Sequence, residues 1–308
     1  MKTLLLTMRE GLYYFDRIKG EELRTEGLFR PMNGLENFVF RVMRRLGSAW
    51  TRLFYGKWYA DLASYDKIIV LDNVCLLDGK LLRNIAKRAP HTPKYLYYWN
   101  IIRDEERYKR TRALADRYGF KVYSYDCGDC EKYDMYFNTI MYDKTLSLGE
   151  REYKNDCLFL GFIKDRAEGM LSLYTAIERA GFSPRFVAVK GNGSASGLPF
   201  EYREDYVPYG EYLDMLAASR AILDIAQKGQ DGYSMRVMEA IFFDKKLITT
   251  NRYVLKAPFY RRENILFIEP DKTTEEEITE FYNLPMQPYS KALKEYYSVE
   301  KWAERFDA

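Results

Sequence analysis

A strand–loop–helix–strand unit between residues 221 and 250 constrains the fold of this chain more than any other stretch. The apolar run Ala221–Ile225 predicts a buried strand, and the polar, Gly-rich run Gln227–Gly232 predicts a loop. A helix is expected over Ser234–Phe243, followed by a second buried strand over Lys246–Thr250. Because consecutive strands joined through a helix are typical of parallel sheets, the unit predicts the α/β class.

The start of the predicted helix has the features of a phosphate-binding site. Free backbone N–H groups from Gly232 to Met235 and the positive end of the helix dipole favour an anion there, and Arg236 adds a cation. Glu239 lies one turn further on, where a carboxylate can accept hydrogen bonds from the vicinal hydroxyls of a ribose. The plain alternative is a Gly-rich turn with Glu239 in solvent, but its apolar neighbours make an unpaired carboxylate costly. The predicted phosphate- and ribose-binding residues of this unit are Gln230, Asp231, Gly232, Tyr233, Ser234, Met235, Arg236 and Glu239.

A second candidate phosphate contact is the run Gly161-Phe-Ile-Lys-Asp-Arg166, which follows another apolar strand. It is expected at the carboxyl edge of the sheet, where open α/β sheets bind ligands. Gly161 permits close backbone approach, and Lys164 and Arg166 can reach a phosphate. The spacing GxGxxG is absent from the sequence, so no nicotinamide fingerprint is present.

Two further turns border the same predicted edge. The run 190–193 ends a strand and is either a nucleotide contact or a surface turn, and the run 206–210 precedes a helix and either packs on a base or forms a simple turn.

Alternating strands and helices predict two Rossmann-like domains, which are expected to face each other across a cleft. We expect a first domain over residues 1–153 and a second domain, which holds the predicted phosphate site, over residues 154–285. Pro285 and Pro288 set apart a final helical pattern, Ser290–Phe306, so residues 286–308 are expected to form a C-terminal helix that packs back on the first domain.

Cysteine and histidine content argues against a metal or redox centre. Four cysteines form no disulfide framework in 308 residues, and Cys127-Gly-Asp-Cys130 has neither a second pair nor histidines beyond His91. No metal and no cofactor are expected. The opening residues Met1–Met8 resemble a buried strand rather than a signal peptide, so a cytoplasmic protein is expected.

The net charge of +3 is unevenly distributed, with the excess of Lys and Arg in the first half. The segment Phe38–Trp58 is aromatic and basic and contains no Asp or Glu. It is either an amphipathic helix on an anionic membrane, on its cytoplasmic face, or a helix of the first domain with a solvated basic face. No nucleic-acid motif accompanies the charge, so nucleic-acid binding is not expected.

Polar residues also follow three predicted strands in the first half. Asp72, Asn100 and Asp126 are the acceptor-side candidates for a catalytic base or a sugar contact, and their spacing favours none of them.

The motif residues resemble the donor half of GT-B-fold glycosyltransferases. The matching stretches are Leu223-Asp-Ile225, Gly229-Gln-Asp-Gly-Tyr-Ser-Met-Arg236, Glu239 and Lys245-Lys-Leu-Ile-Thr-Thr-Asn251. In particular, the chain is similar to bacterial enzymes of lipopolysaccharide and capsule assembly, which are related to the spore-maturation glycosyltransferase-like family. Asp231 and Glu239 have the spacing of the two acids in the Glu-x7-Glu motif of retaining members, with Asp in the first place, and Gln227 stands where members often carry His.

The resemblance implies a metal-independent hexosyltransferase. Its donor would be a nucleoside-diphosphate sugar, bound by the donor-binding domain over residues 154–285. Its acceptor would be a saccharide or a lipid-linked saccharide of surface polysaccharide assembly, on the side of the acceptor-side domain over residues 1–153. Tyr98-Trp-Asn100 in the first half and the tail around Trp302 also resemble the family, whose final helix crosses back to the first domain. A sugar-nucleotide epimerase and a non-catalytic nucleotide-sugar-binding protein of the same fold are the alternatives.

Overall fold

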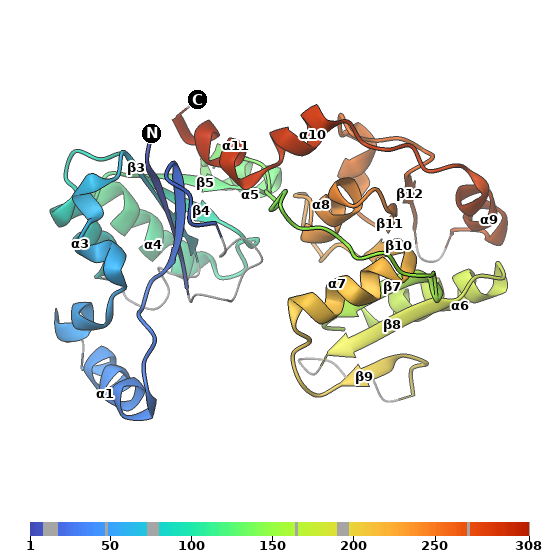
Figure 1. The fold of residues 1–308 in the computed structure, drawn as a ribbon, viewed down its shortest axis with the longest axis horizontal. Helices are drawn as coiled ribbons and strands as arrows, with labels where there is room; N and C mark the ends of the chain where they lie inside the picture. Colours follow the sequence, from blue (N-terminus) through green and yellow to red (C-terminus); the bar gives the residue numbers. More distant parts are fainter. Residues whose placement is uncertain are drawn as a thin grey trace. The chain divides into compact units, whose positions relative to one another are not determined.

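Two compact units form the chain in the computed structural model, which describes residues 1–8, 18–46, 49–72, 80–163, 166–189, 197–269 and 272–307 (Figure 1). Unit 1 comprises Met1–Thr139 and Val299–Ala308, and unit 2 comprises Ile140–Ser298. Each unit is built on its own parallel sheet.

Unit 1 has a six-stranded parallel sheet in the order β2-β1-β3-β4-β5-β6. Its strands are β1 (Thr3–Thr7), β2 (Leu23–Gly27), β3 (Lys67–Leu71), β4 (Lys94–Tyr98), β5 (Phe120–Ser124) and β6 (Tyr136–Phe137). Its helices are α1 (Gly34–Arg45), α3 (Leu81–Arg88), α4 (Glu105–Arg117), α5 (Cys127–Tyr133) and α11 (Val299–Glu304), with the 3₁₀ helices η1 (Ala49–Phe54), η2 (Lys57–Tyr59), η3 (Leu62–Ser64) and η5 (Arg305–Asp307). All residues of β1, β3 and β4 are buried, as expected for strands covered on both faces.

Unit 2 has a second six-stranded parallel sheet in the order β12-β11-β10-β7-β8-β9. Its strands are β7 (Asn155–Gly161), β8 (Pro184–Val189), β9 (Glu201–Arg203), β10 (Ser219–Asp224), β11 (Lys246–Thr249) and β12 (Ile265–Phe267). Its helices are α6 (Ala167–Arg179), α7 (Tyr209–Ala217), α8 (Met235–Phe242), α9 (Glu275–Asn283) and α10 (Lys291–Tyr296), with the 3₁₀ helix η4 (Arg252–Lys256). Numbered within the unit, this is the strand order 3-2-1-4-5-6 of dinucleotide-binding Rossmann folds, with its switch point between β7 and β10.

Alternation along the central strands of unit 2 directs side chains to opposite faces of the sheet. Phe159, Leu223 and Ile248 share one buried cluster with α6 and α9 side chains such as Leu173 and Phe281. The alternate strand residues are buried on the other face, where α7 and α8 contact β10. Both faces are thus covered, so the predicted α/β class with two Rossmann-like units is confirmed.

Of the C-terminal segment 286–308, only Val299–Ala308 belongs to unit 1, whereas residues 286–298 belong to unit 2. The expected single helix over Ser290–Phe306 is wrong, because α10 ends at Tyr296 and α11 begins at Val299. Buried Lys67 of β3 donates to the carbonyl of Ala303 at 2.9 Å, and the Tyr123 hydroxyl donates to that of Phe306 at 2.7 Å. These bonds hold the tail on the first sheet, as predicted from the position of Trp302.

The second unit begins at Ile140, earlier in the chain than the boundary at 153 that the sequence suggests. The side chain of Tyr142 explains the difference. It is fully buried, its ring packs on Phe242 and Phe243, and its amide donates to the carbonyl of Tyr297 at 2.9 Å. These contacts place the segment after Thr139 in unit 2.

The basic aromatic segment Phe38–Trp58 is not one amphipathic helix. It is divided between α1, η1 and η2. Phe40, Phe54 and Trp58 are buried, and the Trp58 indole N–H donates to the carbonyl of Leu28 at 3.0 Å. These three side chains attach the segment to unit 1, so its aromatic content is partly core.

Candidate functional site

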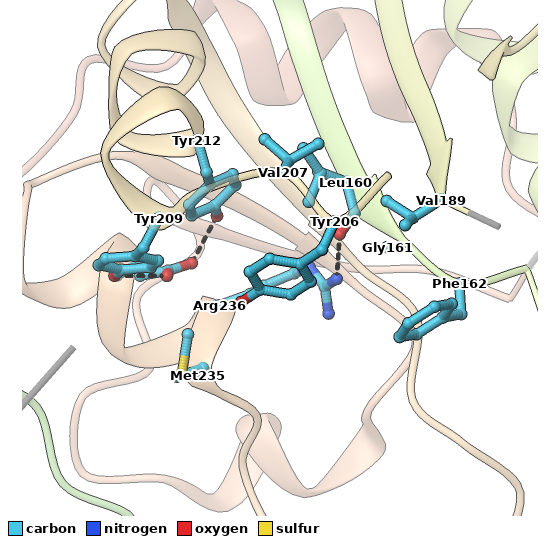
Figure 2. Close-up of a pocket in the computed structure, with 11 residues that line it drawn as sticks. Leu160, Gly161, Phe162, Val189, Tyr206, Val207, Tyr209, Tyr212, Met235 and Arg236 are labelled. Atoms are coloured by element: carbon cyan, nitrogen blue, oxygen red, sulfur yellow. Dashed lines mark hydrogen bonds between the residues drawn. The ribbon is translucent and has the colours of Figure 1, made fainter. Parts of the chain in front are cut away.

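A pocket of about 190 Å³ opens at the carboxyl edge of the unit 2 sheet (Figure 2). It lies where β7 and β8 end and where α7 and α8 begin, beside the switch point of the strand order. Its lining residues are Leu160, Gly161, Phe162, Val189, Tyr206, Val207, Tyr209, Tyr212, Met235, Arg236 and Glu239. The pocket is therefore mostly apolar, with one cation and one carboxylate in its wall.

Glu239 is the buried carboxylate of this pocket. Its side chain is 1% exposed, so the alternative of a solvated helix residue is wrong. One carboxylate oxygen accepts a hydrogen bond from the Tyr209 hydroxyl at 2.9 Å, and the other accepts from the Tyr212 hydroxyl at 2.5 Å. The Tyr209 hydroxyl is also hydrogen-bonded to that of Tyr142. Since each carboxylate oxygen has two lone pairs, the tyrosines orient Glu239 and leave it able to accept more donors.

Burial raises the pKa of Glu239 to about 7, although the hydrogen bonds from Tyr212 and Tyr209 and the charge of Arg236 act to lower it. Below pH 7 the carboxyl is therefore mostly protonated, and it is a poor acceptor for two ribose hydroxyls.

We expect the affinity for a nucleoside diphosphate to rise with pH up to about pH 7 and to level off above it. This expectation applies to a ribose bound at Glu239, because only the ionised form of this carboxyl, whose pKa is about 7, can accept from both ribose hydroxyls. Isothermal titration calorimetry between pH 5.5 and 8.5 measures this profile. The ligand phosphate also titrates, so Glu239→Gln is the control. If the variant has the same profile as the wild type, Glu239 is not the titrating group.

Arg236 is held in the pocket wall by three contacts. Its guanidinium donates to the carbonyl of Leu160 at 2.5 Å, lies 4.0 Å from a carboxylate oxygen of Asp224 and stacks over the ring of Phe159 at 5.0 Å (Figure 2 draws the first). A Cβ atom at Gly161 would lie 2.8 Å from a guanidinium nitrogen. Glycine at 161 therefore makes room for the arginine, as well as lining the pocket.

The first turn of α8 is capped from within. The Ser234 hydroxyl accepts from the amide of Arg236 at 3.1 Å and donates to Asp224 at 2.8 Å. The other carboxylate oxygen of Asp224 accepts from the Thr249 hydroxyl at 2.9 Å. Asp224 thus joins the ends of β10 and β11 to the start of α8, whose residue Met235 lines the pocket.

The stretch Thr249–Asn251 holds the loop that precedes α8. The Thr250 hydroxyl accepts from the amide of Ala226 at 2.9 Å, and the Asn251 side chain donates to the carbonyl of Gly232 at 3.0 Å. Gln230 donates to the same carbonyl at 3.1 Å. These polar residues of the motif therefore shape the loop.

The structure brings together four of the predicted donor-binding residues: Gly161, Met235, Arg236 and Glu239. The remaining loop residues, Gln230, Asp231, Gly232, Tyr233 and Ser234, lie outside the pocket lining. Arg166 also lies outside it, because its guanidinium donates to the carbonyls of Phe162 and Ile225. Lys164 and the run 190–193 fall outside the described residues.

Four tyrosine and valine side chains of the pocket have only a weak signal in the sequence. Tyr206, Val207 and Tyr209 belong to the turn that the sequence marks as a possible base contact. Tyr212 carries no such mark, although its spacing of three residues from Tyr209 places both on one face of α7.

The acceptor-side candidates follow three adjacent strands of unit 1. Asp72, Asn100 and Asp126 come after β3, β4 and β5, so they share the carboxyl edge of that sheet. Asp72 accepts from the amide of Trp99 at 3.3 Å. Asp126 is buried and caps α5 by accepting from the amide of Asp129 at 3.0 Å, which gives its carboxylate a structural role.

The CxxC pair forms the first turn of α5. Cys127 and Cys130 form no disulfide, and burial raises the pKa of Cys130 to about 12, so this thiol stays protonated. Within the described ranges, no group of three or more His, Cys, Asp or Glu side chains is placed to hold a metal ion. In the same part of the chain, no helix has the length and apolar character needed to span a bilayer.

No protein-family model matches the chain, and no curated protein sequence matches it. Solved structures with the same architecture do match over nearly the whole chain. An α-glucosyltransferase in complex with UDP and a 13-mer DNA is similar at a TM-score of 0.58 and 13% identity, over 98% of this chain and 94% of the other. AviGT4, a glycosyltransferase involved in avilamycin A biosynthesis, is similar at a TM-score of 0.54 and 13% identity, over 100% of this chain and 96% of the other. T4 phage BGT in complex with UDP-glucose is similar at a TM-score of 0.51 and 12% identity, over 100% of this chain and 98% of the other.

The chain has the GT-B fold. At these identities the similarity describes the fold alone. In the GT-B fold of this chain, the pocket with Arg236 and Glu239 lies in unit 2, the half that the sequence predicts to bind the donor.

Proposed function

We propose that this GT-B protein is a glycosyltransferase whose donor is a nucleoside-diphosphate sugar bound in the unit 2 pocket. The observation that carries the proposal is the pair Arg236 and Glu239. One turn apart on α8, they present a guanidinium and a buried carboxylate to the same pocket. A cation beside a helix start suits a diphosphate, and a carboxylate suits two ribose hydroxyls. Two of the similar solved structures contain UDP or UDP-glucose, which also supports this class of donor.

The apolar lining completes a nucleoside site. The side chains of Tyr206, Val207 and Phe162 line the same pocket as Arg236 (Figure 2). A base packs against such aromatic and aliphatic groups, and the ribose then lies toward Glu239. In this arrangement the diphosphate lies against Arg236 and the first turn of α8.

The transfer step has a simple electrostatic requirement. As the bond between the sugar and the diphosphate breaks, negative charge accumulates on the leaving phosphate. A positioned guanidinium and helix amides stabilise that charge without reorganising. In our proposal Arg236 and the amide of Met235 have this role, and the reaction needs no metal ion.

For the acceptor we propose a saccharide or a lipid-linked saccharide in surface polysaccharide or lipopolysaccharide assembly, with a hexose as the transferred sugar. Asp72 and Asn100, at the carboxyl edge of the unit 1 sheet, are the acceptor-side candidates. A lipid-linked acceptor agrees with peripheral membrane contact through the basic, aromatic segment of unit 1.

A thermal-shift panel of UDP, GDP, ADP, CMP and dTDP, each with its sugar conjugates, tests the donor proposal. One nucleotide class is expected to raise the melting temperature in the presence of EDTA, because ligand that binds only the folded protein stabilises it by mass action. If no member of the panel raises it, the proposal is wrong.

Turnover separates the proposal from its two alternatives. The matching sugar nucleotide is incubated without acceptor and the products are separated by chromatography. An epimerase would isomerise the donor, whereas a glycosyltransferase releases nucleoside diphosphate and does so faster with the right acceptor. Binding without either product would indicate a non-catalytic protein.

A further inference from the structure

Helix α1 of unit 1 exposes the face that an amphipathic helix normally buries. Among its described side chains only Phe40 is buried, where it packs on Phe29 and Phe54 with ring centroids 4.6 and 5.4 Å apart. Leu35, Phe38 and Val42 are 73%, 65% and 41% exposed. Phe40 thus attaches α1 to unit 1 while the apolar side chains face solvent.

These exposed side chains form one continuous row. Leu35, Phe38, Val42 and Leu46 are spaced three or four residues apart, which places them along one side of the helix. Leu46 is 78% exposed. Helix η1 contacts α1 and exposes two more large apolar side chains. We call the exposed set, together with the cations around it, the α1–η1 surface; its apolar members are Leu35, Phe38, Val42, Leu46, Trp50 and Leu53.

The cations of the α1–η1 surface are exposed and face no acidic residue of their own segment. They are Arg41, Arg44, Arg45, Arg52 and Lys57. Residues 37–58 contain no Asp or Glu, and the preceding Glu36 is already paired with Arg30 at 2.7 Å and accepts from the amide of Asn33 at 3.0 Å. Successive residues of a helix are rotated by about 100°, which places Arg41 and Arg45 beside the apolar row. From there their long side chains can reach past the apolar face.

The apolar row and the cations around it together favour one kind of partner for the α1–η1 surface. A second copy of the chain would bring two sets of like charges together, which opposes self-association. Nucleic acid would attract the cations but offers phosphates and base edges, rather than hydrocarbon, to Leu35, Phe38 and Leu46. The surface of an anionic bilayer offers negative headgroups and, just beneath them, acyl chains.

We propose that the α1–η1 surface binds the headgroup region of an anionic lipid bilayer, with the apolar row inserted and the arginines among the headgroups. The proposal names a partner for unit 1. It does not depend on the donor pocket, which is in unit 2.

Co-sedimentation of the full chain with vesicles tests the proposal. Binding is expected to vesicles of phosphatidylcholine with about 30% phosphatidylglycerol, and far less to phosphatidylcholine alone. Phe38→Ser with Leu46→Ser is expected to weaken binding by at least about tenfold, and Arg41→Gln with Arg45→Gln by about tenfold or more. Matched controls are Leu171→Ser with Leu255→Ser, exposed in unit 2, and Arg107→Gln with Arg110→Gln on α4, which remove equal numbers of groups elsewhere.

Tryptophan fluorescence gives a second readout. Trp50 is 60% exposed, whereas Trp58 and Trp302 are buried. Insertion is expected to shift the emission to shorter wavelength, and Trp50→Phe to remove that shift. The nucleotide-induced thermal shift should be unchanged in all these variants, so the two proposals fail separately.

Three results would overturn the proposal. The first is equal binding to neutral and anionic vesicles, or none. The second is self-association by analytical ultracentrifugation that Phe38→Ser with Leu46→Ser abolishes, which would assign the surface to a second copy. The third is preferential binding of duplex DNA that depends on Arg41 and Arg45, which would assign it to nucleic acid.

Discussion

Glu239→Gln is expected to remove most of the thermal stabilisation by nucleoside diphosphate and to leave the ligand-free protein at least as stable as the wild type at pH 8. Hydrogen bonds to a charged acceptor contribute roughly 1.5–3 kcal/mol each. In the proposed binding mode Glu239 accepts two ribose hydroxyls, so losing its charge should weaken binding at least about tenfold. The measurement is the melting temperature with ligand at about ten times the wild-type Kd, where that loss removes most of the stabilisation.

The expected stability of the ligand-free Glu239→Gln variant follows from the pKa of Glu239. Its folded-state pKa of about 7 lies above the ordinary value of 4.5, because the buried site disfavours the charge. The stability that this group contributes is thus fully present below about pH 4.5 and is lost as pH rises through 7. At pH 8 the wild type carries a buried charge that the glutamine variant lacks.

A smaller ligand-induced thermal shift together with an unchanged or higher melting temperature of the ligand-free protein distinguishes a ligand-binding carboxylate from a structural one. Were Glu239 present only to anchor Tyr209 and Tyr212, its replacement would lower the melting temperature and leave the ligand shift intact. Glu178→Gln, on the exposed side of α6, is the matched control and should change neither quantity.

Substitutions at Arg236 are expected to affect the diphosphate rather than the nucleoside. Arg236→Gln should lower kcat/KM by roughly 10²–10³, the usual cost of removing one group that stabilises transition-state charge. Arg236→Lys should retain part of the activity, because it keeps the charge but loses the planar fork that reaches both Leu160 and the pocket. Steady-state kinetics with the donor from the panel measures the first effect.

Calorimetry with the nucleoside and with its diphosphate measures the selectivity. Arg236→Gln should weaken only the diphosphate, whereas Glu239→Gln should weaken both, because the ribose is common to them. Arg252→Lys, an exposed arginine of unit 2 paired with Glu269, is the control. An equal loss of nucleoside and diphosphate affinity in Arg236→Gln would mean that the arginine supports the pocket wall without contacting phosphate.

Much of the fold can be predicted from the sequence. The runs Thr3–Thr7, Lys67–Leu71 and Lys94–Tyr98 form strands of unit 1. They are apolar runs buried on both faces, so hydrophobicity alone marks them. The strands β6 and β9 escape prediction because they are short and their side chains are exposed. Strand β2 escapes because charged Arg24 and Glu26 alternate with its buried residues.

The candidate site is predictable only in part. Arg236 and Glu239 stand out because a charge within an apolar helical run demands a partner. The loop from Gln230 to Ser234 also stands out, but its polar groups bond to one another, to Asp224 at the end of β10 and to Asn251 after β11 instead of lining the pocket. Composition shows that a loop is polar, and it does not show which way each polar group turns.

The order of apolar and polar residues by itself determined two parallel sheets, a helix start with a cation and a carboxylate one turn apart, and a tail set apart by prolines. These are local properties, because strand and helix periods and turn residues act over a few neighbouring positions. Only the tertiary structure decided that Tyr209 and Tyr212 meet Glu239, that Arg236 reaches the carbonyl of Leu160, and that α1 turns its apolar row outward. The two contacts join residues far apart in the chain, and the orientation of α1 depends on how Phe40 packs on unit 1. All three are set by the close packing of helices on the two sheets, which local sequence patterns do not specify.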